Sequence, residues 1–289
     1  MKNFSFFIFP VFTMLFFSSC SKSEEIDQTD SETLVKDEVP KDVLAKLETA
    51  HFSTSNAFLT TYQGSSVVAV EDMFLTLTQI DELAKEYSNP ESLEKHYRTI
   101  NLVEIPEDTR TLVVETVGDG LGTLGDTALD NVVDAYNDLN AEIRLRRLNT
   151  GESSANIDIA VTVFAEQPSD GTIVLGRSAG FPSNGNPASS FGINSVAIEL
   201  LNTTTTELSN TMAHEIGHAI GFRHTDFATR ESCPPSSQGN EGSAFVGAIY
   251  IDGSPTGSDI TSLMQACAGG NTTGNIFNEN DVNAFREVY

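Results

Sequence analysis

The sequence predicts an α/β (α+β) fold, in which strands and helices form layers and a loop-rich C-terminal part follows. Residues 110–116, 143–148 and 157–164 read as strands, and the last two alternate apolar and polar residues as half-buried strands do. Between the first two segments, residues 127–142 place apolar side chains at the spacing of one helix face. Strands that alternate with a helix in this way are typical of α/β layers.

The remaining elements are predicted in order along the chain. Residues 39–98 contain a helix that starts near Val39-Pro40, a strand at 67–70, a helix around 78–87 and, after Asn89-Pro90, another short polar helix. Residues 180–187 read as a loop, 191–200 as a strand and 207–220 as a helix preceded by threonines suited to capping it. A Gly-, Ser-, Pro- and Asn-rich stretch follows Phe227, and residues 280–288 form a final helix.

Composition bounds the partners of the chain. The 289 residues carry a formal net charge of −25, with 39% hydrophobic and 20% charged residues. Those fractions describe a foldable globular protein. Nucleic acid is excluded as a partner, because phosphate binding needs basic patches. The acidity itself indicates solubility and colloidal repulsion rather than a particular site. We expect a monomer.

The N-terminus predicts export and a lipid anchor. Lys2 precedes an apolar stretch at 4–17, which has the length of a signal-peptide core and is too short to span a bilayer comfortably. The following Ser18-Ser19-Cys20 resembles a bacterial lipobox, from which Phe17 departs because an aliphatic residue is usual there. The prediction is a lipoprotein signal peptide at 1–19, lipidation of Cys20 and a disordered tether at 20–38. The protein would then lie in the bacterial cell envelope, anchored to the outer membrane or at the cell surface; an ordinary signal peptide cut nearby is the alternative.

Cys233 and Cys267 remain once Cys20 is assigned to the lipid. An exported compartment permits a disulfide between them, and an even pair is expected there. Closing a loop of this length would stabilise the chain by roughly 4 kcal/mol at most. Two free buried thiols are the alternative.

Three of the five histidines lie within eleven residues, in the segment HEIGHAIGFRH at 214–224. His214 and His218 are four residues apart on the predicted helix, so both imidazoles face one side and can share a zinc ion. On a continuing helix His224 would lie about 15 Å further along the axis than His214. Gly221 supplies the break, because glycine adopts the left-handed conformation that ends helices. The spacing therefore predicts a site with three histidine ligands for one Zn²⁺. His51 and His96 have no partners nearby and are predicted to be surface residues.

This segment resembles the extended zinc motif of the metzincin metallopeptidases, and HEIGH followed by GFRHTD is similar to their dual-action HEIGH family. The resemblance covers most of residues 99–289, including the segment around Asn240-Glu241-Gly242, and more faintly residues 39–98. It implies a metzincin-like twisted mixed sheet with an active-site helix, and a loop-rich C-terminal subdomain with a methionine turn at Met264 beneath the histidines. Position 266 is alanine, so the tyrosine ligand of the astacin type is absent. A Cys233–Cys267 bridge would tether the methionine turn to the loop that leaves His224.

The implied activity is zinc-dependent hydrolysis of peptide bonds in a protein or peptide substrate. Three neutral imidazoles leave a zinc ion one open position for water, which is the mark of a catalytic site. Glu215 would act as general base on that water. Glu199 and Glu207 read as solvated carboxylates, and Asp226 is a weaker candidate for orienting a ligand histidine. Two alternatives stay open: a catalytically silent surface binding protein on the same fold, and a zinc hydrolase of a non-peptide amide.

Residues 39–98 form a candidate pro-segment, since metzincin pro-segments often block the zinc and sometimes do so through an aspartate. Val70-Glu71-Asp72-Met73 faintly resembles such a stretch, with Glu71 where glycine would be expected. The segment has no cysteine, which excludes a cysteine switch. One tetrapeptide is a weak signal, so ordinary acidic surface is the favoured interpretation of Asp72. The metallopeptidase domain is assigned to residues 99–289.

Overall fold

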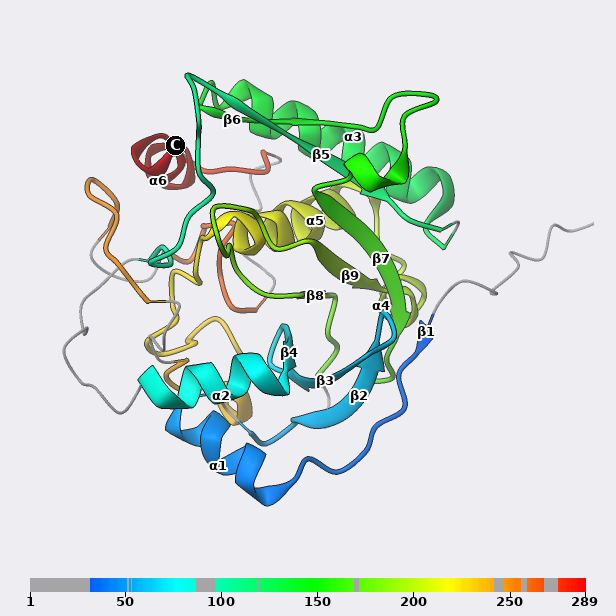
Figure 1. Ribbon diagram of the computed structural model, residues 1–289, viewed down its shortest axis with the longest axis vertical. Coiled ribbons are helices and arrows are strands. Elements are labelled where there is room, and N and C mark those ends of the chain that lie inside the picture. The colour runs from blue at the N-terminus through cyan, green and yellow to red at the C-terminus, as the bar shows by residue number, and fades with distance from the viewer. Residues whose placement is uncertain are drawn as a thin grey trace, which may run out of the picture.

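The computed structural model describes residues 32–50, 52, 54–86, 97–118, 120–168, 172–241, 247–255, 259–267 and 275–289 (Figure 1). The predicted signal peptide, Cys20, His51, His96 and the polar helix after Asn89-Pro90 lie outside these residues. Within the described part, none of the helices combines the length and the apolar character needed to cross a membrane.

One mixed sheet organises the described residues. Its strands run in the order β2-β3-β4-β8-β9-β7-β5-β6, and β1 pairs with β7. Strands β5, β6, β7 and β9 are mutually parallel where they pair, whereas β8 runs antiparallel to β9. The strands are β1 (Glu32–Thr33), β2 (Phe58–Tyr62), β3 (Ser65–Val70), β4 (Met73–Thr76), β5 (Arg110–Thr116), β6 (Ile143–Arg146), β7 (Ile159–Ala165), β8 (Gly176–Ser178) and β9 (Ser190–Asn194).

The described residues before position 87 extend this sheet rather than standing apart from it. Strands β2, β3 and β4 form an antiparallel meander, and β4 joins β8 through the pair Met73 and Ser178. Helices α1 (Lys41–Thr49) and α2 (Leu77–Glu86) belong to the same region, and Figure 1 shows them at the end of the molecule opposite α3. The N-terminal strands are thereby joined to the rest of the sheet at β8, which lies between β4 and β9.

The predicted tether is corrected at its C-terminal end. Glu32 and Thr33 pair in parallel with Phe164 and Ala165 of β7, and the side chain of Leu34 is buried beside them. Residues 32–34 therefore lie against the sheet, because an apolar leucine in an otherwise polar stretch finds a place in the core formed by Phe58, Phe74 and Phe164.

Two helices pack together over the main part of the sheet. Helix α3 (Gly122–Asp138) buries Leu129, Val132 and Tyr136, the face that the apolar spacing predicts. Helix α5 (Thr205–Ile220) packs along α3, and the Tyr136 hydroxyl donates to the carbonyl of Ala213 at 2.8 Å. The core between them and the sheet holds α5 in place, which fixes the position of its histidines.

The strand predicted at 191–200 is wrong in its second half. Strand β9 ends at Asn194, whose side chain accepts a hydrogen bond from the backbone N–H of Val196 and starts helix α4 (Ser195–Leu201). The apolar run after Asn194 carries no clear period, so the cap decides the structure.

The C-terminal part is rich in turns, as predicted. It contains the 3₁₀ turn η2 (Pro235–Ser237) and ends in helix α6 (Glu279–Val288); a second 3₁₀ turn, η1 (Ser154–Asn156), precedes β7. A disulfide joins Cys233 to Cys267, with the Cα atoms 5.0 Å apart. The alternative of two free thiols is therefore set aside.

Candidate functional site

Helix α5 begins at a capping box and ends at a glycine, and both signals are present in the sequence. Thr204 and Glu207 form a capping box at its N-terminus, so Glu207 has a structural partner as well as solvent. The helix ends at Gly221, which has φ 112°. A side chain there would also meet Thr99, because an added Cβ would lie 2.8 Å from the Thr99 Oγ1. Only glycine lets the chain turn back at this point.

The turn brings all three predicted ligands together. The Nε2 atoms of His214 and His218 are 3.0 Å apart, those of His218 and His224 are 3.1 Å apart, and those of His214 and His224 are 3.2 Å apart. Nitrogens bound to one zinc ion at about 2.0–2.1 Å in a tetrahedral arrangement have a similar separation. His224, the ligand that depends on the turn at Gly221, lies where the motif predicts.

The opposite ring nitrogens show why these Nε2 atoms face one another. The Nδ1 of His214 lies 2.9 Å from the Leu263 carbonyl, that of His218 lies 2.8 Å from the Phe222 carbonyl, and that of His224 lies 2.6 Å from the Glu241 carboxylate. An acceptor at each Nδ1 keeps the proton there and leaves the Nε2 lone pair unprotonated. Three converging lone pairs repel one another unless a cation lies between them. The residues present therefore fit a zinc ion.

Asp72 completes the cluster from the turn between β3 and β4. Its Oδ2 lies 2.8 Å from the Nε2 of His224, 3.1 Å from that of His218 and 3.8 Å from that of His214. These four residues form a group whose ligand atoms all lie within 4.8 Å of one another. Burial alone would raise the pKa of Asp72, but the three imidazoles hold it well below its ordinary value. The interpretation of Asp72 as ordinary acidic surface is wrong.

Glu241 is a functional residue that spacing did not identify. Its carboxylate is 4% exposed and accepts from the Nδ1 of His224. Asp226, the residue proposed for orienting a histidine, instead accepts from Ser232 and from the backbone N–H of Ala266. It thus connects the loop after His224 to the segment after Met264. The only sequence signal for Glu241 was its place in the Asn240-Glu241-Gly242 segment of the family resemblance.

Glu215 lies beside the cluster on the sheet side of α5. The residue is 2% exposed, and its Oε2 has no hydrogen-bond partner among the described residues. Gly176 of β8 lies so close that any side chain there would collide with this carboxylate. Burial, and then the nearby charge of Asp72, raise the pKa of Glu215 well above its ordinary value. A buried carboxyl with an unpaired oxygen next to a metal site is suited to accepting a proton.

Met264 lies beneath the histidine helix, as the resemblance implies. An added Cβ at Gly217 would lie 2.5 Å from the Met264 Sδ, so the thioether packs directly on this helix glycine. The Met264 carbonyl also accepts from the backbone N–H of Thr225, one residue after His224. Met264 therefore contacts both segments that carry ligands.

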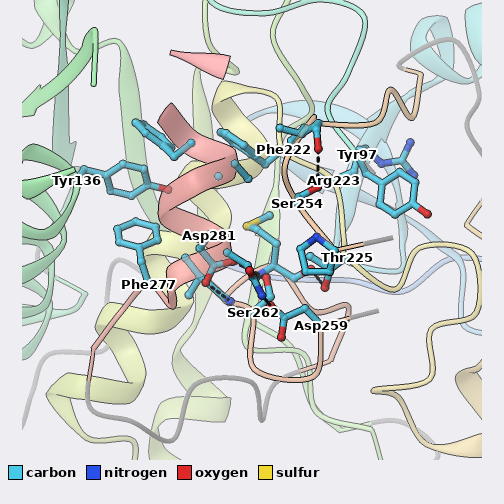
Figure 2. Close-up of a pocket in the computed structure, with 18 residues that line it drawn as sticks. Tyr97, Tyr136, Phe222, Arg223, Thr225, Ser254, Asp259, Ser262, Phe277 and Asp281 are labelled. Atoms are coloured by element: carbon cyan, nitrogen blue, oxygen red, sulfur yellow. Dashed lines mark hydrogen bonds between the residues drawn. The ribbon is translucent and has the colours of Figure 1, made fainter. Parts of the chain in front are cut away.

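A small cavity of about 50 Å³ lies beside Met264 and Gly217 (Figure 2). Tyr136 and Phe277 meet edge to face on one side of it. On another side Asp281 of α6 accepts from the Ser262 hydroxyl at 2.6 Å and from the backbone N–H of Leu263 at 3.0 Å. Because the Leu263 carbonyl is the acceptor for His214, helix α6 helps to orient this ligand.

Two larger cavities flank the metal cluster. One has a volume of about 570 Å³ and is lined by His214 and Glu215, and the other has about 290 Å³ and is lined by His218 and His224. Glu71 and Asp72 line both. The turn between β3 and β4 therefore lies between these two cavities, next to the three histidines.

Myroilysin has 16% sequence identity over 64% of this chain and 97% of its own, with a TM-score of 0.38. High choriolytic enzyme 1, a hatching enzyme zinc-protease from Oryzias latipes (Medaka fish), has 12% identity over 68% of this chain and 97% of its own, with a TM-score of 0.37. No curated protein sequence matches the chain. The model of the dual-action HEIGH metallo-peptidases matches residues 67–289. The chain belongs to this family of metallopeptidases.

Proposed function

We propose that the chain is a zinc-dependent peptidase that hydrolyses peptide bonds with Glu215 as general base. The observation that carries the proposal is the convergence of three histidine Nε2 atoms beside a buried carboxyl whose Oε2 has no hydrogen-bond partner among the described residues. His214, His218 and His224 would hold one zinc ion. When bound, the ion supplies a Lewis acid that polarises a carbonyl and lowers the pKa of water to about 7.

Glu215 would then transfer the proton during the reaction. Glu215 Oε2 accepts a proton from the attacking water, and the same carboxyl delivers it to the leaving amine. The orienting acceptors at Leu263, Phe222 and Glu241 keep the three imidazoles in one tautomer throughout.

The described chain is proposed to be a latent form, with residues 39–98 as its pro-segment and 99–289 as the peptidase domain. Asp72 stands at the position that water and substrate would need, and the carbonyl of Asp72 accepts from the backbone N–H of Ser178 on β8. A substrate strand would use that same sheet edge, because an exposed edge pairs with an extended peptide. Removal of the segment would free both the metal and the edge.

Export and anchoring complete the proposal. We assign residues 1–19 to a lipoprotein signal peptide and Cys20 to lipidation, so that the monomeric enzyme acts from the bacterial outer membrane or cell surface. The Cys233–Cys267 disulfide supports an oxidising compartment, because such bonds are rare in reducing ones. Mass spectrometry of the mature N-terminus, with a Cys20→Ser control, tests the lipid.

The test of the reaction uses the full chain with a specific protease site inserted at residue 90. The folded protein is cut at that site, separated from the N-terminal piece and loaded with zinc. We expect it to cleave casein, and to lose this activity on chelation and in the Glu215→Gln variant. Glu207→Gln, a change of a capping glutamate on the same helix, is the matched control and should remain active.

The outcomes separate the alternatives. Cleavage by Glu215→Gln at the wild-type rate would contradict the general base. A cut, zinc-loaded wild type that cleaves no peptide bond would instead favour a binding protein or a hydrolase of another amide.

A further inference from the structure

A buried ion pair lies one residue away from the metal cluster. Arg230 Nη1 is 2.8 Å from the Glu71 Oε1, and the two side chains are 9% and 6% exposed. Glu71 directly precedes Asp72 in the turn that crosses the site. Arg230 comes from the loop between His224 and Cys233. Neither the three-histidine site nor the proposed general base uses this pair.

Both partners occupy a backbone conformation that their residue types rarely adopt. Glu71 has φ 51° and Arg230 has φ 48°. The left-handed region is unfavourable for such residues, whereas glycine adopts it readily. A glycine at position 71 would relieve the backbone and lose the carboxylate. The sequence therefore keeps a charged side chain at a position where the backbone alone favours glycine.

Residue 71 is also held by its backbone. The guanidinium of Arg177 on β8 donates to the Glu71 carbonyl, while its other nitrogens bind the buried carboxylate of Glu166. Two arginines thus hold one residue, Arg177 at the main chain and Arg230 at the side chain. This is how a cleft binds a peptide residue, with one contact independent of sequence and one that selects it.

We propose that Arg230 forms the subsite for an acidic side chain next to the scissile bond of the substrate, and that Glu71 fills this subsite in the latent form. The inference rests on the proposed function, since it requires the N-terminal region to leave the cleft. The substrates would then be proteins or peptides that are cut next to an aspartate or a glutamate.

The contacts of Arg230 allow its guanidinium to bind the carboxylate of a substrate. Its Nε has no hydrogen-bond partner among the described residues, and the nearest oxygen of Glu241 is 3.5 Å away. That same Glu241 oxygen is already bonded to His224. Once Glu71 leaves, a buried guanidinium would lose its closest carboxylate, which is costly unless another carboxylate replaces it. Arg230 lines the same 570 Å³ cavity as His214 and Glu215, so a bound substrate reaches it.

The first test measures binding without catalysis. The Glu215→Gln chain is cut at residue 90, separated from its N-terminal piece, loaded with zinc and titrated with a ten-residue peptide of the sequence 67–76, VVAVEDMFLT. The same peptide with glutamine in place of Glu71 is expected to bind at least about tenfold more weakly, as for other close charge pairs. Arg230→Gln should remove this difference, and Arg230→Lys should restore part of it. Equal binding of the two peptides by the chain with Arg230 would overturn the proposal, whatever the fate of the variants.

Arg177→Gln is the matched control. It removes a guanidinium from the carbonyl of the same peptide residue, so it should weaken both peptides alike and leave their ratio unchanged. A ratio that collapses in Arg177→Gln and persists in Arg230→Gln would assign the selectivity to the wrong arginine and contradict the subsite.

The second test measures cleavage of a mixture of random decapeptides by the cut, zinc-loaded chain with Glu215 intact. Fragment sequencing should show Asp and Glu enriched at one position adjacent to the cut, and Arg230→Gln should abolish the enrichment. Cleavage without acidic enrichment contradicts the subsite alone. Absence of any cleavage contradicts the proposed function and the subsite together.

Discussion

Asp72 Oδ2 lies 2.8 Å from Nε2 of His224, although the two residues come from opposite halves of the chain. The contact joins a β-turn of the N-terminal region to the histidine that follows Gly221. A carboxylate this close to three imidazole nitrogens could supply a fourth ligand to an ion held by the histidines. The relationship makes the N-terminal region part of the metal site, which leads to the first prediction.

Asp72→Ala in the uncut full chain should raise its peptidase activity at least about tenfold, because a blocked metal position becomes open while three histidine ligands remain. Zinc content should stay at one equivalent. Asp37→Ala, which removes an exposed carboxylate from the segment just before this region, is the control and should leave the chain latent. Equal activity of the Asp72→Ala and Asp37→Ala chains would show that Asp72 does not block the site.

Glu241→Gln should weaken zinc binding by about 10- to 100-fold, the usual effect of losing a carboxylate behind a ligand histidine. The amide still accepts a hydrogen bond from His224 Nδ1, but it no longer supplies the negative charge that makes the imidazole a stronger donor. Competition with a chromogenic chelator measures the affinity. Unchanged affinity would mean that the 2.6 Å contact does not tune the ligand.

Gly217→Ala should lower the melting temperature although alanine is the better helix former. Its Cβ would lie 2.5 Å from the Met264 Sδ, so the thioether must move out of a packed floor. Overpacking of this kind costs about 1–3 kcal/mol, which exceeds the roughly 1 kcal/mol gained in helix propensity. The double variant with Met264→Ala should be destabilised by less than the sum of the two single changes. Strict additivity would argue against direct packing of Met264 on Gly217.

Tyr62 should make stability fall at high pH. Burial raises its pKa to about 12, whereas a tyrosine in the unfolded chain titrates at about 10. Between these values the unfolded state has lost a proton that the folded state keeps, so the free energy of unfolding falls as pH rises from about 10 to 12. Tyr62→Phe should lose less stability over that range in urea titrations. An identical loss in both proteins would exclude Tyr62 as a source.

The three histidines, Glu215 and Gly221 were predictable because local geometry defines them. Helix spacing pairs His214 with His218, and a glycine at the helix end returns His224. The partners of the site were not predictable in this way. Asp72 reaches His218 across 146 residues and Glu241 reaches His224 across a loop, and no short-range pattern reports such contacts.

The parts of the fold with a clear local sequence pattern were predictable, and the parts that depend on long-range pairing were not. The strand at 110–116 and the helix around 127–142 have clear patterns, and β5 and α3 correspond to them. The helix α4 was missed because one side chain, Asn194, ends a strand and caps a helix within an apolar run. The joining of the N-terminal strands to β8 depends on a single pair, Met73 and Ser178, which periodicity does not encode. The boundary between residues 39–98 and 99–289 stays a prediction.

The most direct test of the account is metal analysis of the purified full chain combined with X-ray absorption at the zinc edge. We expect one equivalent of zinc bound by three nitrogens at about 2.0–2.1 Å and one oxygen. Asp72→Ala should keep the three nitrogens, and His224→Ala should lose most of the metal. Less than about half an equivalent of zinc, with binding insensitive to His224→Ala, would contradict the three-histidine site.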